Sequence, residues 1–178
     1  FVTRHPYIAE MVFEQVYVNE DDRYNKYIEV LAKLDIDYES DLLVFNELTN
    51  ARRLMEIFKD NNKIRSIFQI AKEGAGDDPF VMQQESIFEM RAEDGDFHKS
   101  ESLLQDATEI DPDNIFFLHT RAELFLKRAE KTDNFLIRKQ LVKRTKELCT
   151  NILQNFKNRS ANLSPTYHTL LKTHILRS

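Results

Sequence analysis

Histidine and cysteine are the side chains of this sequence best suited to metal binding or nucleophilic chemistry, and their spacing matches no known centre. No two histidines have the spacing of a metal-binding His-Glu-x-x-His helix. Cys149 is the single cysteine, which excludes an internal disulfide and any zinc or iron–sulfur site built on several cysteines. It follows Leu148 on an apolar helix flank, so we expect its thiol to fill the core. The histidines are His5, His98, His119, His168 and His174.

The remaining polar motifs also predict structural roles. The Gly-Ala-Gly run at 74–76 lacks the Gly-Lys-Ser/Thr that completes a phosphate-binding loop. The acidic pairs Asp94/Asp96 and Asp111/Asp113 lie in turns, where carboxylates cap helices. His119, on the first turn of a predicted helix, is expected to be packed or solvated, the alternative being that it faces a partner groove. We therefore expect no enzyme active site, no metal and no catalytic residue in this segment.

The composition predicts an all-α fold. Of 178 residues, 42% are apolar and 31% charged, with only three Gly and four Pro, too few for a β-rich protein with many tight turns or for a disordered linker. No apolar run is long enough to span a membrane. The first residue is Phe, so we expect a segment of a longer, cytoplasmic protein.

Charge is divided unevenly along the chain, whose net charge is −5. Residues 1–112 hold 25 acidic and 12 basic side chains, whereas residues 113–178 hold 5 acidic and 13 basic ones. A basic face of this kind binds an acidic protein surface or nucleic acid, or is simply solvated. Nucleic acid is disfavoured because no aromatic or glycine pattern accompanies the basic residues. The candidate partner-binding residues are Arg138, Lys139, Lys143, Arg144 and Lys146.

Apolar periodicity and caps divide the chain into successive helices. Asn19 is expected to cap one helix. Ser40 opens another stretch, whose apolar stripe runs Val44, Leu48, Ala51, Met55 and Phe58. Further helices are predicted over 63–73, 80–93, 97–110, 115–130, about 133–156 and 165–177. We divide the chain into a helical region at 1–60 and helical repeats at 61–178.

Residues 81–112 resemble a tetratricopeptide repeat. The unit is helix, short turn, helix and proline turn, and Pro79 and Pro112 are 33 residues apart, close to the period of stacked helical hairpins. Gly-Asp-Phe at 95–97 matches the family's mid-repeat turn. Ser100, Leu104 and Ala107 match its small, large and small positions, and Leu118, Ala122 and Phe125 match the first helix of the next unit. The departures are Phe88, where the family prefers Gly or Ala, a degenerate unit at 61–79 and an overlong last helix.

Residues 3–12 resemble the winged-helix end of STAND-type regulated NTPases, relatives of the AAA+ ATPases. His5 matches the family's histidine, while Arg4 and Pro6 replace its Met and Asp. In that family the histidine contacts the phosphates of bound ADP, so the resemblance implies that His5, with Arg4, senses nucleotide. A helix N-terminus suits such a contact. The alternative is that His5 only precedes a helix started by proline.

The rest of the chain, notably 87–91 and 117–124, looks like the C-terminal helical part of large bacterial STAND-like proteins. Such proteins often carry an N-terminal effector domain, for example a sirtuin-like or TIR-like one, and act in anti-phage defence. The resemblance implies a non-catalytic sensor and autoinhibitory arm that binds a protein partner or other domains of its parent, with ATP or ADP and Mg²⁺ bound elsewhere in the parent and oligomerisation on activation. The alternatives are a stand-alone tetratricopeptide-type adaptor, and nucleic-acid binding through the basic helix 138–146.

Overall fold

The computed structural model describes residues 13, 15–155 and 163–175 and is all-helical over that part of the chain. Contacts divide the chain into two compact units, residues 1–77 and 78–178. The first unit contains α2 (Glu20–Leu31), α3 (Glu39–Leu48), α4 (Ala51–Ile57) and α5 (Asn61–Ala75). The second contains α6 (Pro79–Arg91), α7 (Phe97–Ile110), α8 (Ile115–Lys131), α9 (Phe135–Asn155) and α10 (Ser164–Ile175).

In the first unit, α2 is held by aromatic packing and by a carboxylate. The Tyr27 and Phe58 rings meet edge to face at 5.3 Å, and the Tyr27 hydroxyl donates to the Leu48 carbonyl at 2.8 Å. The Glu20 carboxylate accepts from the backbone N–H groups of Lys59 and Asp60, both at 3.2 Å. The turn between α4 and α5 is thereby fixed against the start of α2.

The stretch that runs from Ser40 to Phe58 is divided into two helices, α3 and α4, although its predicted apolar stripe continues across both. The Thr49 hydroxyl donates to the Phe45 carbonyl at 2.8 Å, and the Asn50 side chain caps α4 by accepting from the Arg53 N–H at 3.2 Å. This break changes which residues face inward. Val44 is 44% exposed and Phe45 only 3%, so the prediction that Val44 lies on the buried stripe was wrong.

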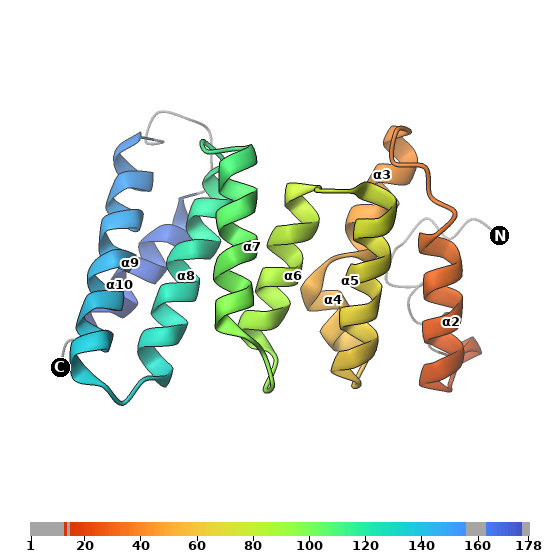
Figure 1. The fold of residues 1–178 in the computed structure, drawn as a ribbon, viewed down its shortest axis with the longest axis horizontal. Helices are drawn as coiled ribbons and strands as arrows, with labels where there is room; N and C mark the ends of the chain where they lie inside the picture. The colour runs from red at the N-terminus through yellow and green to blue at the C-terminus, as the bar shows by residue number, and fades with distance from the viewer. Residues whose placement is uncertain (1–12, 14, 156–162, 176–178) are drawn as a thin grey trace. The chain divides into compact units, whose positions relative to one another are not determined.

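In the second unit, α6, α7, α8 and α9 run alternately up and down, and each packs on the next (Figure 1). Helix α10 contacts both α8 and α9 and crosses behind them in this view. Buried hydroxyls join α6 to α7: the Ser86 and Ser100 hydroxyls are 2.7 Å apart. The Gln83 amide joins α6 to α8 by donating to the Thr120 hydroxyl at 2.8 Å. These polar contacts fix the register of the helices.

Small residues allow α6 and α7 to approach closely. Ser100, Leu104 and Ala107 on α7 are fully buried. A Cβ added to Gly95, in the turn between the two helices, would lie 1.9 Å from the Glu89 carbonyl oxygen. Only glycine fits there without moving the backbone.

Two sequence predictions concern boundaries and the N-terminus. The two compact units meet after α5, and the sequence-based boundary at residue 60 stays a prediction. Arg4 and His5 lie outside the described residues. Within the described parts of the chain, no helix combines the length and apolar character needed to cross a membrane.

Candidate binding pocket between α8 and α9

Capping and turn contacts build the α8–α9 hairpin. The Asn114 side chain caps α8 by accepting from the Phe116 N–H at 3.0 Å. The Asn134 side chain accepts from the Leu136 N–H at 3.0 Å at the start of α9. Arg138 donates from Nη2 to the Thr132 carbonyl at 2.7 Å and so ties the turn to α9.

An apolar seam then holds the two helices together. It consists of buried Phe125 and Ala129 from α8 and buried Leu141 and Val142 from α9, with half-buried Leu148 packed against it. Fully buried Thr145 of α9 donates to the Leu141 carbonyl within its own helix at 3.0 Å. The seam fixes both backbones, so side chains at its edge have defined positions.

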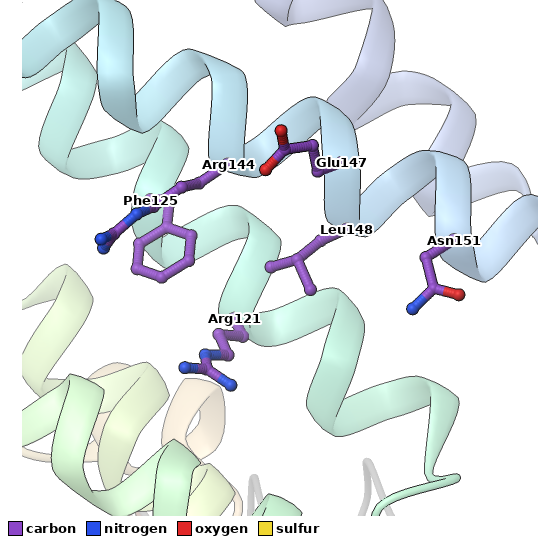
Figure 2. Close-up of a pocket in the computed structure, with 6 residues that line it drawn as sticks. All are labelled: Arg121, Phe125, Arg144, Glu147, Leu148 and Asn151. Carbon is purple, nitrogen blue, oxygen red and sulfur yellow. The ribbon is translucent and has the colours of Figure 1, made fainter.

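A pocket of about 400 Å³ opens along the edge of this seam (Figure 2). Its walls combine cationic, acidic, amide and apolar side chains from the two helices. Figure 2 shows the Phe125 ring between two arginine side chains, one from each helix. The lining residues are Arg121, Phe125, Arg144, Glu147, Leu148 and Asn151.

The two guanidinium groups converge on one aromatic ring. The Arg121 guanidinium carbon lies 5.9 Å from the Phe125 ring centroid, and that of Arg144 lies 5.6 Å from it. Both distances lie within cation–π range. The Nε–H of Arg121 is covered and has no hydrogen-bond acceptor. Within the described part of the chain, neither arginine forms an ion pair.

Besides Arg144, helix α9 supplies a carboxylate, an amide and an apolar side chain to the pocket. The Glu147 carboxylate lies 3.7 Å from the Lys143 Nζ, and most of its side chain is exposed. Asn151, one turn further along α9, is exposed, and Leu148 supplies apolar surface between them. The pocket therefore offers guanidinium donors, a carboxylate acceptor and an apolar wall within one opening.

Of the predicted basic residues, Lys139, Lys143 and Lys146 share one face of α9 by their spacing, whereas Arg138 and Arg144 lie on either side of it. Arg144 lines the pocket, Arg138 is used in the turn, and Lys143 pairs with Glu147. Lys139 is exposed and Lys146 half-buried. Only Arg144 of the five is brought together with other pocket residues. Sequence reasoning missed Arg121, although its position four residues before Phe125 places both side chains on one face of α8.

The Cys149 and His119 side chains both take part in helix packing. The Cys149 thiol is fully buried, and burial raises its pKa to about 11, with a smaller contribution from Glu123. Its expected role in the core is confirmed. The His119 Nε2 lies 3.3 Å from the Thr169 hydroxyl, so this histidine packs against α10. No group of three or more metal-ligating side chains exists among the described residues.

A second charged cluster lies between α6 and α7. The Lys99 ammonium bridges the Glu85 and Glu89 carboxylates at 2.8 and 2.9 Å, and both glutamates are 2% exposed. Burial lowers the pKa of Lys99, but hydrogen bonds to the two carboxylates outweigh it and raise that pKa overall. Buried charges persist when they are paired in this way. The cluster serves helix packing and offers no open site.

The Asp96 carboxylate accepts from the His98 N–H at 2.7 Å and from the Lys99 N–H at 3.2 Å, which confirms its predicted capping role.

Comparison with protein-family models, with curated proteins and with solved structures finds no match to this chain.

Proposed function

We propose that this chain is a non-catalytic protein-recognition segment, built from tetratricopeptide-like helical hairpins, that binds a polypeptide at the α8–α9 pocket. The observation that carries the proposal is the convergence of Arg121 and Arg144 on Phe125, with the Arg121 Nε–H left without an acceptor. Arginine and aromatic side chains together are enriched where proteins bind other proteins.

The hairpin part of the proposal is supported by the packing of α6 against α7. The close approach at Gly95 and the buried Ser86–Ser100 contact are what a stacked helical repeat requires of its small positions. Each such hairpin leaves one helix face for its neighbours and another for a partner. The pocket lies on the next hairpin, formed by α8 and α9.

The resemblance of residues 3–12 supports a wider form of the proposal, in which the segment is the sensor and autoinhibitory arm of a nucleotide-regulated parent. A partner that prefers the open arrangement of such an arm shifts the equilibrium by no more than its difference in affinity for the two states. In the intact parent, His5→Ala is then expected to weaken ADP retention and raise basal activity. Unchanged nucleotide content in the purified variant contradicts this wider form alone.

The recognition proposal is tested by selecting random short peptides displayed on phage against the 178-residue chain. Asn151→Trp places a large side chain at the mouth of the pocket and is expected to abolish enrichment. Thr150→Trp is the matched control, since Thr150 is exposed on the same helix and does not line the pocket. Absence of enrichment by the wild-type chain, or equal enrichment by Asn151→Trp, would falsify the proposal.

A further inference from the structure

We infer that the α8–α9 pocket is a carboxylate-binding subsite, in which Arg121 and Arg144 together hold an aspartate or glutamate side chain within an acidic peptide. This inference rests on the proposed function, because it names the chemistry of the partner that the pocket recognises.

The first argument is the state of the guanidinium donors. A guanidinium carries five N–H donors in a planar fork that matches a carboxylate. The Arg121 Nε–H is covered yet has no acceptor, and polar groups in that position are normally satisfied. The Arg121 side chain is half-buried and lines the pocket, so a carboxylate there can accept from the N–H groups of the guanidinium that remain accessible.

The second argument is that neighbouring cations already have partners. Arg128 pairs with Glu101, and the Lys127 Nζ lies 3.5 Å from Glu130. By contrast, Arg121 and Arg144 face one ring from two helices without an acid between them (Figure 2). Both guanidinium groups lie within 6 Å of the same ring centroid, so their positive potentials add at this edge of the hairpin and attract an anion.

The third argument concerns which anion fits. Glu147 lines the same pocket, so a nucleic-acid backbone, which is charged at every nucleotide, would place phosphates beside it, whereas a peptide can direct one carboxylate to the arginines and a neutral residue past Glu147. A peptide backbone instead offers N–H groups to the Glu147 carboxylate and a carbonyl to the Asn151 amide. Leu148 adds apolar surface for a neighbouring side chain of the peptide. The mixture of donors, acceptors and apolar wall suits an internal residue of an acidic peptide.

The test uses fluorescence polarisation of a labelled peptide of alternating leucine and glutamate, acetylated and amidated at its ends, and a twin with glutamine for glutamate. The wild-type 178-residue chain is expected to bind the glutamate peptide about tenfold more tightly than its twin. The double variant Arg121→Gln/Arg144→Gln is expected to lose that preference, and Arg121→Lys/Arg144→Lys to retain part of it, because lysine keeps the charge without the fork.

The matched control is Lys59→Gln/Lys172→Gln, which removes the same net charge from exposed positions outside the pocket. It is expected to keep the preference to within about twofold. Should the double arginine variant fail to fold by circular dichroism, Arg144→Gln alone, at an exposed position, is expected to reduce the preference.

Equal binding of the two peptides by the wild-type chain, or a preference that survives loss of both arginines, overturns the inference. Tighter binding of an oligothymidylate that disappears with both arginines also overturns it. Suppose that the wild-type chain fails this peptide test but still enriches phage-displayed peptides that Asn151→Trp does not enrich. In that case the proposed function stands and only the carboxylate assignment fails.

Discussion

Gly95 shows how one missing side chain permits the α6–α7 turn. Because an added Cβ would overlap the Glu89 carbonyl oxygen, Gly95→Ala is expected to destabilise the fold by about 1–3 kcal/mol through forced backbone movement. Urea unfolding followed by circular dichroism measures the change in the free energy of unfolding.

Gly74→Ala is the matched control for this substitution. Gly74 lies within α5, where an added Cβ meets nothing within 4 Å. Alanine is favoured over glycine in a helix interior by up to about 1 kcal/mol, so Gly74→Ala is expected to be neutral or stabilising. Equal destabilisation by both substitutions would mean that the close approach at Gly95 is not what makes glycine necessary there.

Cys149 provides a probe of opening at the residue scale. Its thiol is fully buried and its pKa is raised to about 11, so both access and thiolate formation are suppressed in the folded chain. Labelling by iodoacetamide near neutral pH is expected to proceed only as fast as the second unit opens. Rapid labelling without denaturant, at the rate of a free thiol, would contradict the buried placement.

The sign of the accompanying pH dependence follows from the raised pKa. Because folding favours the protonated thiol, its contribution to stability is fully present below the ordinary pKa of 9.0 and is lost as pH rises toward 11. Cys149→Ala is expected to remove this part of the alkaline loss, although it also leaves a small cavity.

At the scale of elements, the Asp96 cap determines where α7 begins. Its carboxylate accepts from the Lys99 and His98 backbone N–H groups, and these bonds lower its pKa below the ordinary value of 3.8. Folding therefore favours the ionised carboxyl, whose contribution is present above pH 3.8 and is lost as pH falls further. Asp96→Ala is expected to lower the urea midpoint at neutral pH by an amount that shrinks in acid.

Asp96→Asn is the control, because asparagine caps helices without ionising. It is expected to retain most of the stability at neutral pH and to flatten the acid limb of the stability profile. An Asp96→Ala deficit of equal size at neutral and strongly acidic pH would show that the charge of the cap contributes nothing.

Helix positions were predictable where local signals agree. The predicted helix 97–110 coincides with α7, since a glycine–aspartate turn precedes it and an aspartate–proline turn follows it. The break between α3 and α4 was missed, because the Asn50 cap and the Thr49 back-bond compete with a periodicity that continues across them. Periodicity alone does not reveal such a competition.

Helix α10 shows a second limit of apolar patterning. Its buried face carries Thr166, Thr169 and Thr173, whereas Tyr167 and Leu171 are 52% and 65% exposed. The threonines satisfy their hydroxyls locally: Thr173 donates to the Leu170 carbonyl at 2.6 Å, and Thr169 meets His119. A sequence pattern that assigns burial to leucines alone cannot predict a helix packed through threonines.

The candidate pocket was only half predictable for a related reason. Arg144 was identified from the concentration of positive charge, which is visible along the sequence. Arg121 and Arg144 belong to different helices and meet at the Phe125 ring only because the seam around Phe125 and Leu141 packs α8 against α9. Charge composition indicates that cations are present, and tertiary packing determines which of them converge.

At the scale of the whole molecule, the basic excess of residues 113–178 is dispersed by its own contacts. Lys143 has an acidic partner on α9, Arg128 has one on α7, and Arg138 is used within the α8–α9 turn. Counterion release by a nucleic-acid backbone requires several cations along one track. Lys139, Lys143 and Lys146 still share one face of α9, but Glu147 lies beside Lys143, so we expect this face to be a weak site for a nucleic-acid backbone.

We therefore expect only weak, salt-sensitive binding of an oligothymidylate by the 178-residue chain, measured by fluorescence anisotropy at about 50 and 200 mM salt. Lys139→Gln/Lys143→Gln/Lys146→Gln is expected to change that weak binding no more than Lys26→Gln/Lys33→Gln/Lys59→Gln, which removes the same charge from the first unit. Both triple variants lower the net charge equally, so a long-range effect of total charge acts on them alike. Tight binding that only the α9 variant abolishes would instead establish a nucleic-acid surface on that helix, since local phosphate contacts alone distinguish the two variants.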